Sequence, residues 1–288
     1  MEVKLMLDKM KIIAQSNHTS KANIAKYMLD HLANIEKMSL EDLAKNTYTS
    51  KSSIVRFAQS FGFKGWTDFL PALISERYYS DTHYSNVNHN LPFSNDDSIE
   101  EIIQKIATIE KESIQDTADK LVASDVDKIA MWLKQANRVV VFGLSPNEYL
   151  AQLFKRKMLT IGKQIEVAHS GEVGLTTASL NQDDVAIVIS YSGNSKQIES
   201  LRYLSSLKEK KVKIVGVTSE QGKYLRENAE ITLTICNRED KYKKIANFST
   251  EESILFILNT IYATYFKKNY FENYIRKINL SAELENQR

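Results

Sequence analysis

The residues with the clearest potential for chemistry form a hydroxyl-rich loop, Ser190-Tyr191-Ser192-Gly193-Asn194-Ser195, directly after the apolar run 185–189. A buried strand that leads through such a loop into a helix favours phosphate binding, because serine hydroxyls and free backbone N–H groups both donate hydrogen bonds to an anion. Gly193 allows close approach of the backbone. The loop has neither a Walker lysine pattern nor Gly-x-Gly-x-x-Gly, which disfavours nucleoside triphosphates and dinucleotides. The alternative is that these hydroxyls only cap a helix and form a turn.

A second loop of this kind, Gly143-Leu144-Ser145-Pro146, follows the apolar run 138–142. Ligands of parallel sheets lie beyond the carboxyl ends of the strands, so Ser145 is expected beside the first loop. Alternatively, Ser145 is only a helix N-cap with Pro146 at the first helical position.

Further partners for a sugar are sought near the same edge. His169 follows the run 164–168, and Glu251 and Glu252 stand where a helix begins that is predicted at 253–266. An uninvolved surface histidine, and carboxylates placed favourably at a helix N-terminus, are the alternatives.

A third constellation suits nucleic acid. Two short helices are predicted within 39–61, the first capped by Ser39 with Asp42 three residues on, the second capped by Ser50. At 100° per residue the second helix has one apolar side and one polar side free of acidic residues. Arginine can contact guanine or phosphate, glutamine can contact adenine, and serine can contact either. The candidates for DNA contact are Ser50, Lys51, Ser52, Ser53, Arg56 and Gln59; the alternative is an ordinary solvated face.

The elements that hold these residues differ along the chain. Five short runs rich in Val and Ile, at 138–142, 164–168, 184–189, 212–217 and 231–235, alternate with helical segments. This alternation predicts a five-stranded parallel, flavodoxin-like sheet with helices on both faces. Everything before residue 78 is expected to be helical, with Ile24, Tyr27, Met28, Leu32 and Ile35 on one amphipathic helix.

A break is visible around residues 78–95, where turn-forming residues replace any helical or strand periodicity. Residues 81–125 hold 3 basic against 10 acidic side chains, a net charge of −7, and include a helix predicted to follow Ser98. The expected organisation is a helix-turn-helix domain over 1–80, an acidic linker with a connecting helix over 81–125, and an α/β domain over 126–288.

Composition limits the class of protein. A chain of 288 residues with 43% hydrophobic and 26% charged residues suits two globular domains. A lone cysteine, Cys236, excludes a disulfide within the chain and a cysteine-rich zinc site. No apolar run reaches 18 residues and Met1-Glu2-Val3-Lys4 has no signal-peptide character, so a cytoplasmic protein without a membrane partner is expected. No metal and no cofactor are expected.

The run 24–70 resembles the N-terminal domain of the RpiR/MurR family of sugar-catabolism regulators. The matching blocks are Ile24-Ala25-Lys26-Tyr27-Met28-Leu29, Ser39-Leu40-Glu41-Asp42-Leu43-Ala44, Ser50, Ile54-Val55-Arg56-Phe57 and, most specific, Phe61-Gly62-Phe63-Lys64-Gly65-Trp66. The tight turn of the family has Gly where this chain has Tyr48. A residue other than glycine with positive φ costs about 1 kcal/mol there.

From about 128 to 266 the chain resembles a sugar isomerase (SIS) domain, the usual second half of these regulators. The signature Ser-x-Ser-Gly-x-Thr/Ser is matched at 190–195, and the first-loop Gly-x-Ser at 143–145. The resemblance implies that Ser145, Ser190, Ser192 and Ser195 hold the phosphate of a phosphosugar. Asn194 replaces the commoner Glu, and Glu251 lies where the family usually carries Ser-Arg.

Together the resemblances imply a DNA-binding regulator of sugar or amino-sugar metabolism, not an enzyme, that binds a phosphosugar and a palindromic operator as a homodimer or homotetramer. One alternative is an aldose–ketose phosphosugar isomerase with an accessory helical domain. Its acid–base candidates are His169, Glu172 and Glu251, which no sequence pattern pairs. Another is a sensor that contacts only protein partners.

Overall fold

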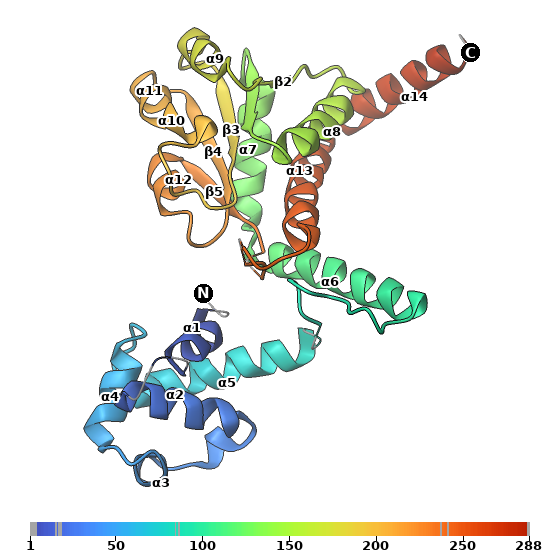
Figure 1. Ribbon diagram of the computed structural model, residues 1–288. Coiled ribbons are helices and arrows are strands. Elements are labelled where there is room, and N and C mark those ends of the chain that lie inside the picture. The colour runs from blue at the N-terminus through green and yellow to red at the C-terminus, as the bar shows by residue number, and fades with distance from the viewer. Residues whose placement is uncertain are drawn as a thin grey trace. The chain divides into compact units, whose positions relative to one another are not determined.

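The computed structural model describes residues 5–14, 16, 19–83, 85, 87–236, 238–240 and 242–286. The chain forms two compact units, Met1–Asn86 and Val87–Arg288 (Figure 1). None of the helices in these described ranges is both long enough and apolar enough to cross a membrane.

The first unit is helical. It contains α1 (Leu5–Ala14), α2 (Ser20–Asp30), the 3₁₀ helix η1 (Leu32–Lys37), α3 (Leu40–Asn46), α4 (Lys51–Gln59) and α5 (Trp66–His83). Both expected caps are present: Ser39 and Asp42 form a reciprocal capping box on α3, and the Ser50 hydroxyl accepts the Ser53 N–H of α4. The core of the unit consists of apolar side chains from every helix, among them Met10, Met28, Leu43, Phe57 and Phe69.

Two expectations for this unit were wrong. The single helix predicted through Ile35 ends at Asp30, and the chain continues as η1. The Arg77 guanidinium of α5 donates hydrogen bonds to the Leu32 and Ala33 carbonyls, so a contact distant in sequence satisfies the backbone where the helix ends. The break expected near residue 78 begins later, because α5 continues to His83.

The second unit is built on five parallel strands, β1 (Val139–Gly143), β2 (Glu166–Val167), β3 (Val185–Ile189), β4 (Lys213–Thr218) and β5 (Ile231–Thr234). Their order in the sheet is β2-β1-β3-β4-β5, with Val139 opposite Val185 and Val185 opposite Lys213. The predicted flavodoxin-like sheet is confirmed. Nearly all strand side chains are buried, as expected for a sheet covered on both faces.

Helices cover both faces of the sheet (Figure 1). One face packs against α7 (Ala123–Gln135), α8 (Asn147–Leu159) and α13 (Phe248–Lys268). The other packs against α9 (Val173–Ser179), α10 (Glu199–Arg202), α11 (Leu204–Glu209) and α12 (Lys223–Asn228). The loops that follow β1 and β3 and the starts of α8 and α13 line one pocket, which is described next.

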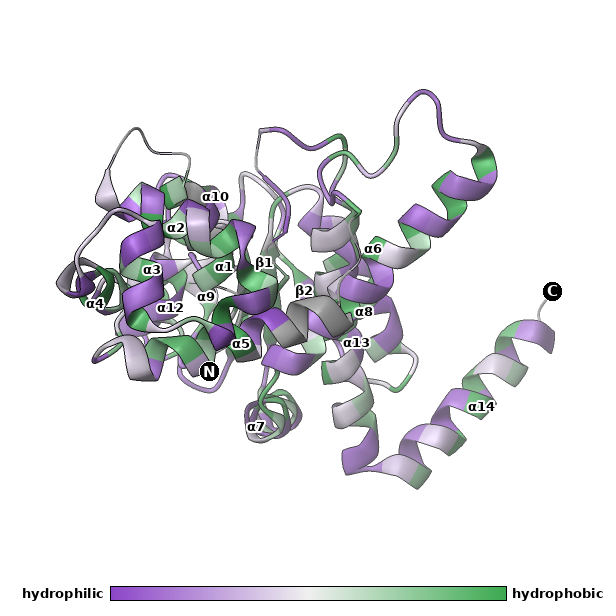
Figure 2. Ribbon diagram, turned by 90° about the horizontal axis from the view of Figure 1, so that it is seen from below, coloured by the Kyte–Doolittle hydropathy of each residue, from purple (hydrophilic) through white to green (hydrophobic). Residues whose placement is uncertain are grey.

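Two further helices lie outside these layers. The helix α6 (Ile99–Lys120) begins with a Ser98–Glu101 capping box and packs its C-terminal half against α13, burying Ile109, Ser113 and Thr117. The last helix, α14 (Tyr270–Asn286), extends away from the α/β body in both views of the ribbon (Figures 1 and 2). The helix α1 lies within the region expected to be helical, whereas no sequence pattern predicted α14.

Candidate functional site

The polar side of α4 is open to solvent. Ser50, Lys51, Ser52, Arg56 and Gln59 are exposed and Ser53 is half-buried, whereas Ile54, Phe57 and Ala58 are fully buried. The face is less bare of acid than the sequence suggested, because Lys51 forms an ion pair with Glu41 of α3. The Ser50 hydroxyl lies 2.8 and 2.9 Å from the hydroxyls of Ser52 and Ser53. In the absence of DNA it therefore caps the helix.

The turn between α3 and α4 has a left-handed backbone at Tyr48, where the family resemblance led us to expect glycine. Tyr48 has φ 54° and its side chain is 94% exposed. The Thr49 N–H donates to the Ala44 carbonyl (2.9 Å), which closes the turn. The turn therefore forms despite the unfavourable conformational energy of the left-handed backbone at Tyr48, and α4 keeps its N-cap.

A pocket of about 370 Å³, here called the sheet-edge pocket, opens beyond β1 and β3. Three chain segments form it: residues 144–147 at the start of α8, residues 189–200 from the end of β3 to the start of α10, and residues 244–251 around the start of α13. Its lining consists of residues 144–147 and 189–192 with Ile198, Ser200, Lys244, Asn247, Thr250 and Glu251. The structure thus brings Ser145, Ser190, Ser192 and Glu251 together in one cavity.

Ser195 and His169 are not among the residues that line this pocket. The Ser195 hydroxyl accepts the Gln197 N–H (3.3 Å), the local turn contact that was the alternative to ligand binding. The His169 ring is 68% exposed, and its Nδ1 lies 3.8 Å from Glu148 Oε1. Of the acid–base candidates His169 and Glu251, therefore, only Glu251 lines the cavity.

The local geometry of the serine loop differs from the expected strand–loop–helix. The helix after the loop, α10, begins only at Glu199 and has four residues, so it offers little dipole to an anion. Gly193 has φ 58°, and a Cβ there would lie 2.4 Å from Thr218 Oγ1 and 2.7 Å from the Gly222 Cα. Glycine is therefore required for packing against the β4–α12 loop rather than for approach to a ligand.

The helix N-termini at the pocket belong instead to α8 and α13. The 13-residue α8 begins at Asn147, directly after Ser145 and Pro146 of the lining. The 21-residue α13 begins at Phe248, between the lining residues Asn247 and Thr250. Both bring the positive end of a helix dipole to the cavity edge, which favours a negatively charged ligand group.

The free N–H groups of α13 already have an acceptor within the chain. The Glu239 carboxylate accepts the Ser249 N–H (2.5 Å), the Thr250 N–H (3.3 Å) and the Thr250 hydroxyl (2.6 Å). Lys244 Nζ lies 2.9 Å from the same carboxylate. Glu239 thus stabilises the first turn of α13, whereas no side chain caps α8, whose first turn carries Glu148.

Lys244 is the cation that lines the pocket, and sequence analysis missed it. Its ammonium group lies 5.2 Å from the centroid of the Tyr191 ring. The Tyr191 hydroxyl donates to the Glu239 carbonyl (2.8 Å), and burial, with the nearby ionisable groups Glu239, Cys236 and Asp240, raises the pKa of that tyrosine. Tyr191 is therefore a neutral donor that fixes the serine loop to residues 239–244.

A buried polar cluster lies behind the pocket, at the start of α13. The ring nitrogens of His89 lie 2.5 Å from Ser249 Oγ and 3.1 Å from Glu112 Oε2 of α6. Arg238 forms ion pairs with Glu112 and with Asp116, the latter at 3.1 Å. Every member is at least nine-tenths buried, so each charge depends on its partners.

Asn90 extends this cluster to the loop that borders the pocket. Its carbonyl accepts the Ile245 N–H (3.1 Å), and its side-chain oxygen accepts the Asp240 N–H (2.5 Å). We call His89 and Asn90 the strap, because they bind the linker to the loop that carries Glu239 and Lys244. No run of periodic residues marks the strap, so sequence analysis could not find it.

No group of three His, Cys, Asp or Glu side chains that could hold a metal ion occurs in the part of the chain that the structure describes.

Comparison with known proteins supports both halves of this description. Residues 4–79 match the family model of the helix-turn-helix domain of the rpiR family, and residues 132–263 match that of the SIS domain. An uncharacterized HTH-type transcriptional regulator of Haemophilus influenzae is 27% identical over 90% of this chain and 88% of its own.

Two solved structures share the fold. The Vibrio vulnificus NanR protein, complexed with ManNAc-6P, superposes with a TM-score of 0.59 at 19% identity, covering 98% of each chain. A candidate sugar-phosphate isomerase of Listeria monocytogenes has a TM-score of 0.53 at 17% identity and covers 60% of this chain and 93% of its own. Because an rpiR-type helix-turn-helix domain is followed by a SIS domain, this chain belongs to the RpiR family of helix-turn-helix transcriptional regulators.

Proposed function

We propose that the protein regulates genes of sugar or amino-sugar metabolism and that its effector is a phosphosugar bound in the sheet-edge pocket. The observation that carries the proposal is the convergence of Ser145, Ser190 and Ser192 with the start of α8 in one 370 Å³ cavity. Such a volume lies within the range of small-ligand sites. Hydroxyl donors and a helix N-terminus together suit the phosphate, and Lys244 adds a positive charge.

The remaining polar groups of the pocket suit the sugar. Glu251 and Asn247 lie on the α13 side of the cavity, with Asn247 Nδ2 3.3 Å from Glu251 Oε1. A carboxylate accepts hydrogen bonds from hydroxyl or amino groups and repels a second phosphate. We therefore expect a monophosphate with its phosphate toward Ser145 and Ser192, and with its hydroxyl or amino groups toward Glu251. The ManNAc-6P named with the NanR structure has this chemistry, which supports the assignment for a protein of the same fold.

The DNA side of the proposal rests on α4. Its exposed residues would enter the major groove, with Arg56 and Gln59 contacting bases or phosphates and Ser50, Lys51, Ser52 and Ser53 contacting the backbone near the helix N-terminus. A symmetric dimer would present two such helices to a palindrome, with half-sites about 34 Å, or a multiple of it, apart. Lys51 would exchange Glu41 for a phosphate on binding.

The strap offers a physical route between ligand and DNA. Only residues 84–88 separate His83, the end of α5, from His89, and His89 contacts the first turn of α13. A ligand that moves Lys244 or Ser192 would disturb Glu239 and, through Asn90, the linker that leads to the reading domain. Asn90→Ala is expected to keep both ligand and DNA affinity while reducing their mutual influence. Unchanged coupling in that variant would contradict this route.

A calorimetric screen tests the proposed effector. Hexose and hexosamine 6-phosphates are titrated into the full-length protein, with the unphosphorylated sugars as controls. We expect one phosphosugar to bind and to raise the free energy of unfolding by about 2.7 kcal/mol at 100 times its Kd. No interconversion of aldose and ketose is expected, because His169 lies outside the lining and does not form an acid–base pair with Glu251. Turnover abolished by Glu251→Gln would favour the isomerase alternative, and binding of the bare sugars alone would contradict the phosphate site.

A further inference from the structure

Tyr48, in the turn between α3 and α4, has the most exposed large hydrophobic side chain in the part of the chain that the structure describes. Its side chain is 94% exposed, whereas the other aromatic side chains described in the first unit are half-buried or fully buried. A single exposed aromatic residue is common on protein surfaces and carries no meaning by itself. Tyr48 differs from such a residue in its surroundings and in its backbone.

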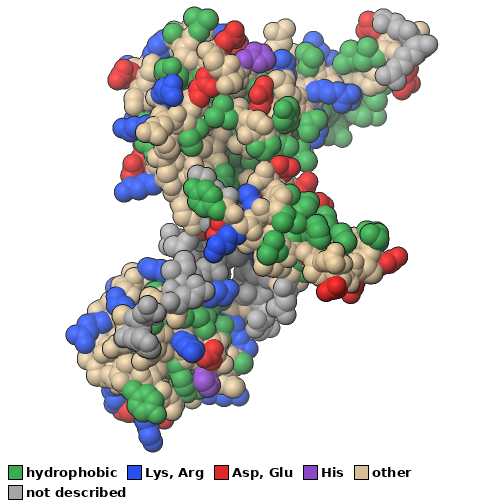
Figure 3. All heavy atoms as spheres, in the orientation of Figure 1, with side chains coloured by type: hydrophobic (Ala, Val, Ile, Leu, Met, Phe, Trp, Pro, Cys, Tyr) green, Lys and Arg blue, Asp and Glu red, His purple; other side chains and the backbone are tan. Residues whose placement is uncertain are grey.

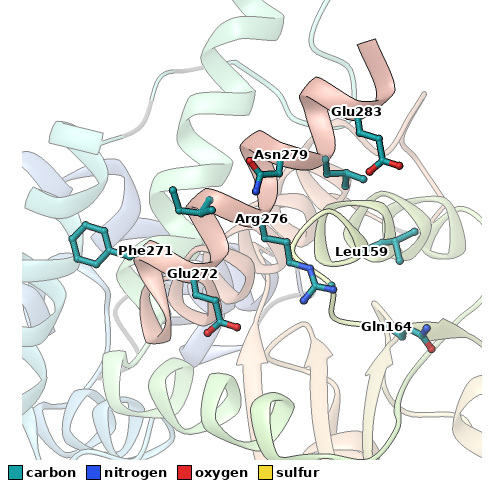
Figure 4. Close-up of a pocket in the computed structure, with 10 residues that line it drawn as sticks. Leu159, Gln164, Phe271, Glu272, Arg276, Asn279 and Glu283 are labelled. Carbon is teal, nitrogen blue, oxygen red and sulfur yellow. The ribbon is translucent and has the colours of Figure 1, made fainter. Parts of the chain in front are cut away.

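The surroundings of Tyr48 are polar. Every other residue of the run 45–53 has a polar side chain. By contrast, the exposed Phe271 of α14 borders a groove of about 870 Å³ together with Leu159 and Ile275 (Figure 4). In the space-filling view, hydrophobic side chains gather over α6, whereas those of the first unit are scattered among polar and charged side chains (Figure 3). The position of Tyr48 therefore suits a polar ligand better than an apolar partner.

The backbone of Tyr48 is strained. Its φ of 54° lies in the left-handed region, which glycine adopts freely and which is unfavourable for a residue with a side chain. Because the side chain is 94% exposed, packing within the domain does not compensate for this strain. Strain of this kind is concentrated at functional positions, where a ligand contact offsets it.

The turn itself is held by the two threonines that flank Tyr48. The buried Thr47 hydroxyl donates to the Leu43 carbonyl (2.7 Å) and lies 2.8 Å from the Thr49 hydroxyl. The Thr49 N–H donates to the Ala44 carbonyl (2.9 Å). These contacts fix the backbone on both sides of Tyr48 without using its side chain. The phenol is thus carried by an ordered turn, which lowers the entropic cost of a contact with a ligand.

We propose that the Tyr48 hydroxyl donates a hydrogen bond to a phosphate of the DNA backbone, beside the bases that α4 contacts; this inference rests on the DNA binding proposed for α4. In a helix-turn-helix, the first helix crosses the DNA backbone and the N-terminal residues of the second contact base edges. The turn that joins the two helices therefore lies beside the phosphates that border the groove. Tyrosine hydroxyls are among the side-chain donors that contact phosphate oxygens.

The charge of the segment favours the same ligand. From residue 43 to residue 67 the chain has no acidic side chain and four basic ones, Lys45, Lys51, Arg56 and Lys64. The two carboxylates that precede this segment already have partners. Glu41 is paired with Lys51, and the Asp42 carboxylate accepts a hydrogen bond from the Ser39 hydroxyl. An anionic ligand beside Tyr48 therefore meets a segment of positive charge.

Fluorescence anisotropy of a duplex that the full-length protein selects from random DNA tests the contact. Tyr48→Phe keeps the ring and removes the hydroxyl, so DNA affinity should fall about tenfold, the lower end of the range for a hydrogen bond to a charged group. Tyr48→Gly should lose at least as much DNA affinity although chemical denaturation finds the protein no less stable, a combination that a purely structural role would not give. Tyr149→Phe, at a tyrosine of α8 that is 67% exposed, is the matched control and should bind DNA unchanged. Unaltered DNA affinity in Tyr48→Phe would overturn the assignment.

Two further measurements test whether the ligand atom is a phosphate oxygen. The loss in Tyr48→Phe should be equal on the selected duplex and on a duplex of unrelated sequence, because phosphates carry no sequence information. The slope of DNA affinity against salt concentration should stay the same, because the hydroxyl carries no positive charge and releases no counterion. A loss confined to the selected duplex, or a smaller slope, would overturn the phosphate contact. If the unaltered protein bound neither duplex, the DNA binding proposed for α4 would fail instead, so the two failures are distinguishable.

Discussion

The polar face of α4 and the sheet-edge pocket are built in opposite ways. All the α4 residues come from one continuous segment, their side chains are largely exposed, and most contact only near neighbours in the sequence. The pocket unites three distant segments, and one of them is held by Arg238, which is only 10% exposed and paired with two buried carboxylates. The effects of substitutions on α4 should therefore be independent of one another. A substitution behind the pocket should instead disturb the whole loop that borders it.

Removal of the buried guanidinium is expected to have the largest effect. Arg238→Met removes the guanidinium that pairs with Glu112 and Asp116 and should lower the free energy of unfolding by about 3–5 kcal/mol. Arg56→Met removes the same group from the exposed face and should change it by less than about 0.5 kcal/mol. Chemical denaturation of both variants measures this difference, and equal effects would refute the contrast between the two regions.

Within the pocket, Ser192→Ala removes a single hydroxyl donor. A hydrogen bond to a charged group contributes about 1.5–3 kcal/mol, so phosphosugar affinity should fall roughly ten- to hundredfold. The fold and the DNA affinity of the unliganded protein should persist, because the Ser192 side chain is only half-buried. Ser205→Ala, on the exposed side of α11, is the matched control for calorimetry. Unchanged phosphosugar affinity in Ser192→Ala would show that the phosphate binds at a site other than Ser192.

On the reading helix, Arg56→Ala should weaken DNA binding by roughly 1–3 kcal/mol if the guanidinium reads a base, with relaxed preference at one position. A phosphate contact would instead give a uniform loss and a smaller salt dependence. Lys208→Ala removes a positive charge from the α/β unit and controls for net charge. An equal loss of DNA affinity in both variants would show that Arg56 contributes only through the net positive charge of the protein.

The sequence predicted the parts of the fold that depend on local pattern. Ser39 and Ser98 begin helices because their capping boxes involve residues three positions away, and the alternation of β-branched runs predicted the five strands. The end of α2 escaped prediction because Arg77, more than forty residues away, satisfies the carbonyls after it.

The same distinction explains the candidate site. Ser145, Ser190 and Ser192 were identifiable because each follows an apolar run at a strand end. Lys244, Glu239 and the strap were not, because their positions depend on contacts with residues such as Tyr191, Thr250 and Asp240 that no spacing rule connects. Ser195 belongs to the sequence signature but does not line the pocket. Its hydroxyl instead accepts a hydrogen bond from the Gln197 N–H in the turn that follows.

The smallest effect is expected at the turn before α4. Tyr48 holds a left-handed backbone that costs about 1–2 kcal/mol for a residue with a side chain, while glycine loses roughly 0.5–1 kcal/mol more chain entropy on folding. Tyr48→Gly should therefore stabilise the protein by at most about 1 kcal/mol, measured by denaturation. Marked destabilisation would mean that the exposed Tyr48 ring contributes a contact of its own.

The central claim is that a phosphosugar in the sheet-edge pocket controls DNA binding by α4. Fluorescence anisotropy of a duplex that the protein selects from random DNA, titrated with and without saturating phosphosugar, tests it directly. The two ligands should change each other's affinity by the same factor, in the range of about 5- to 150-fold that is typical of coupled sites. Identical DNA affinity in the presence and absence of a bound phosphosugar would contradict the account.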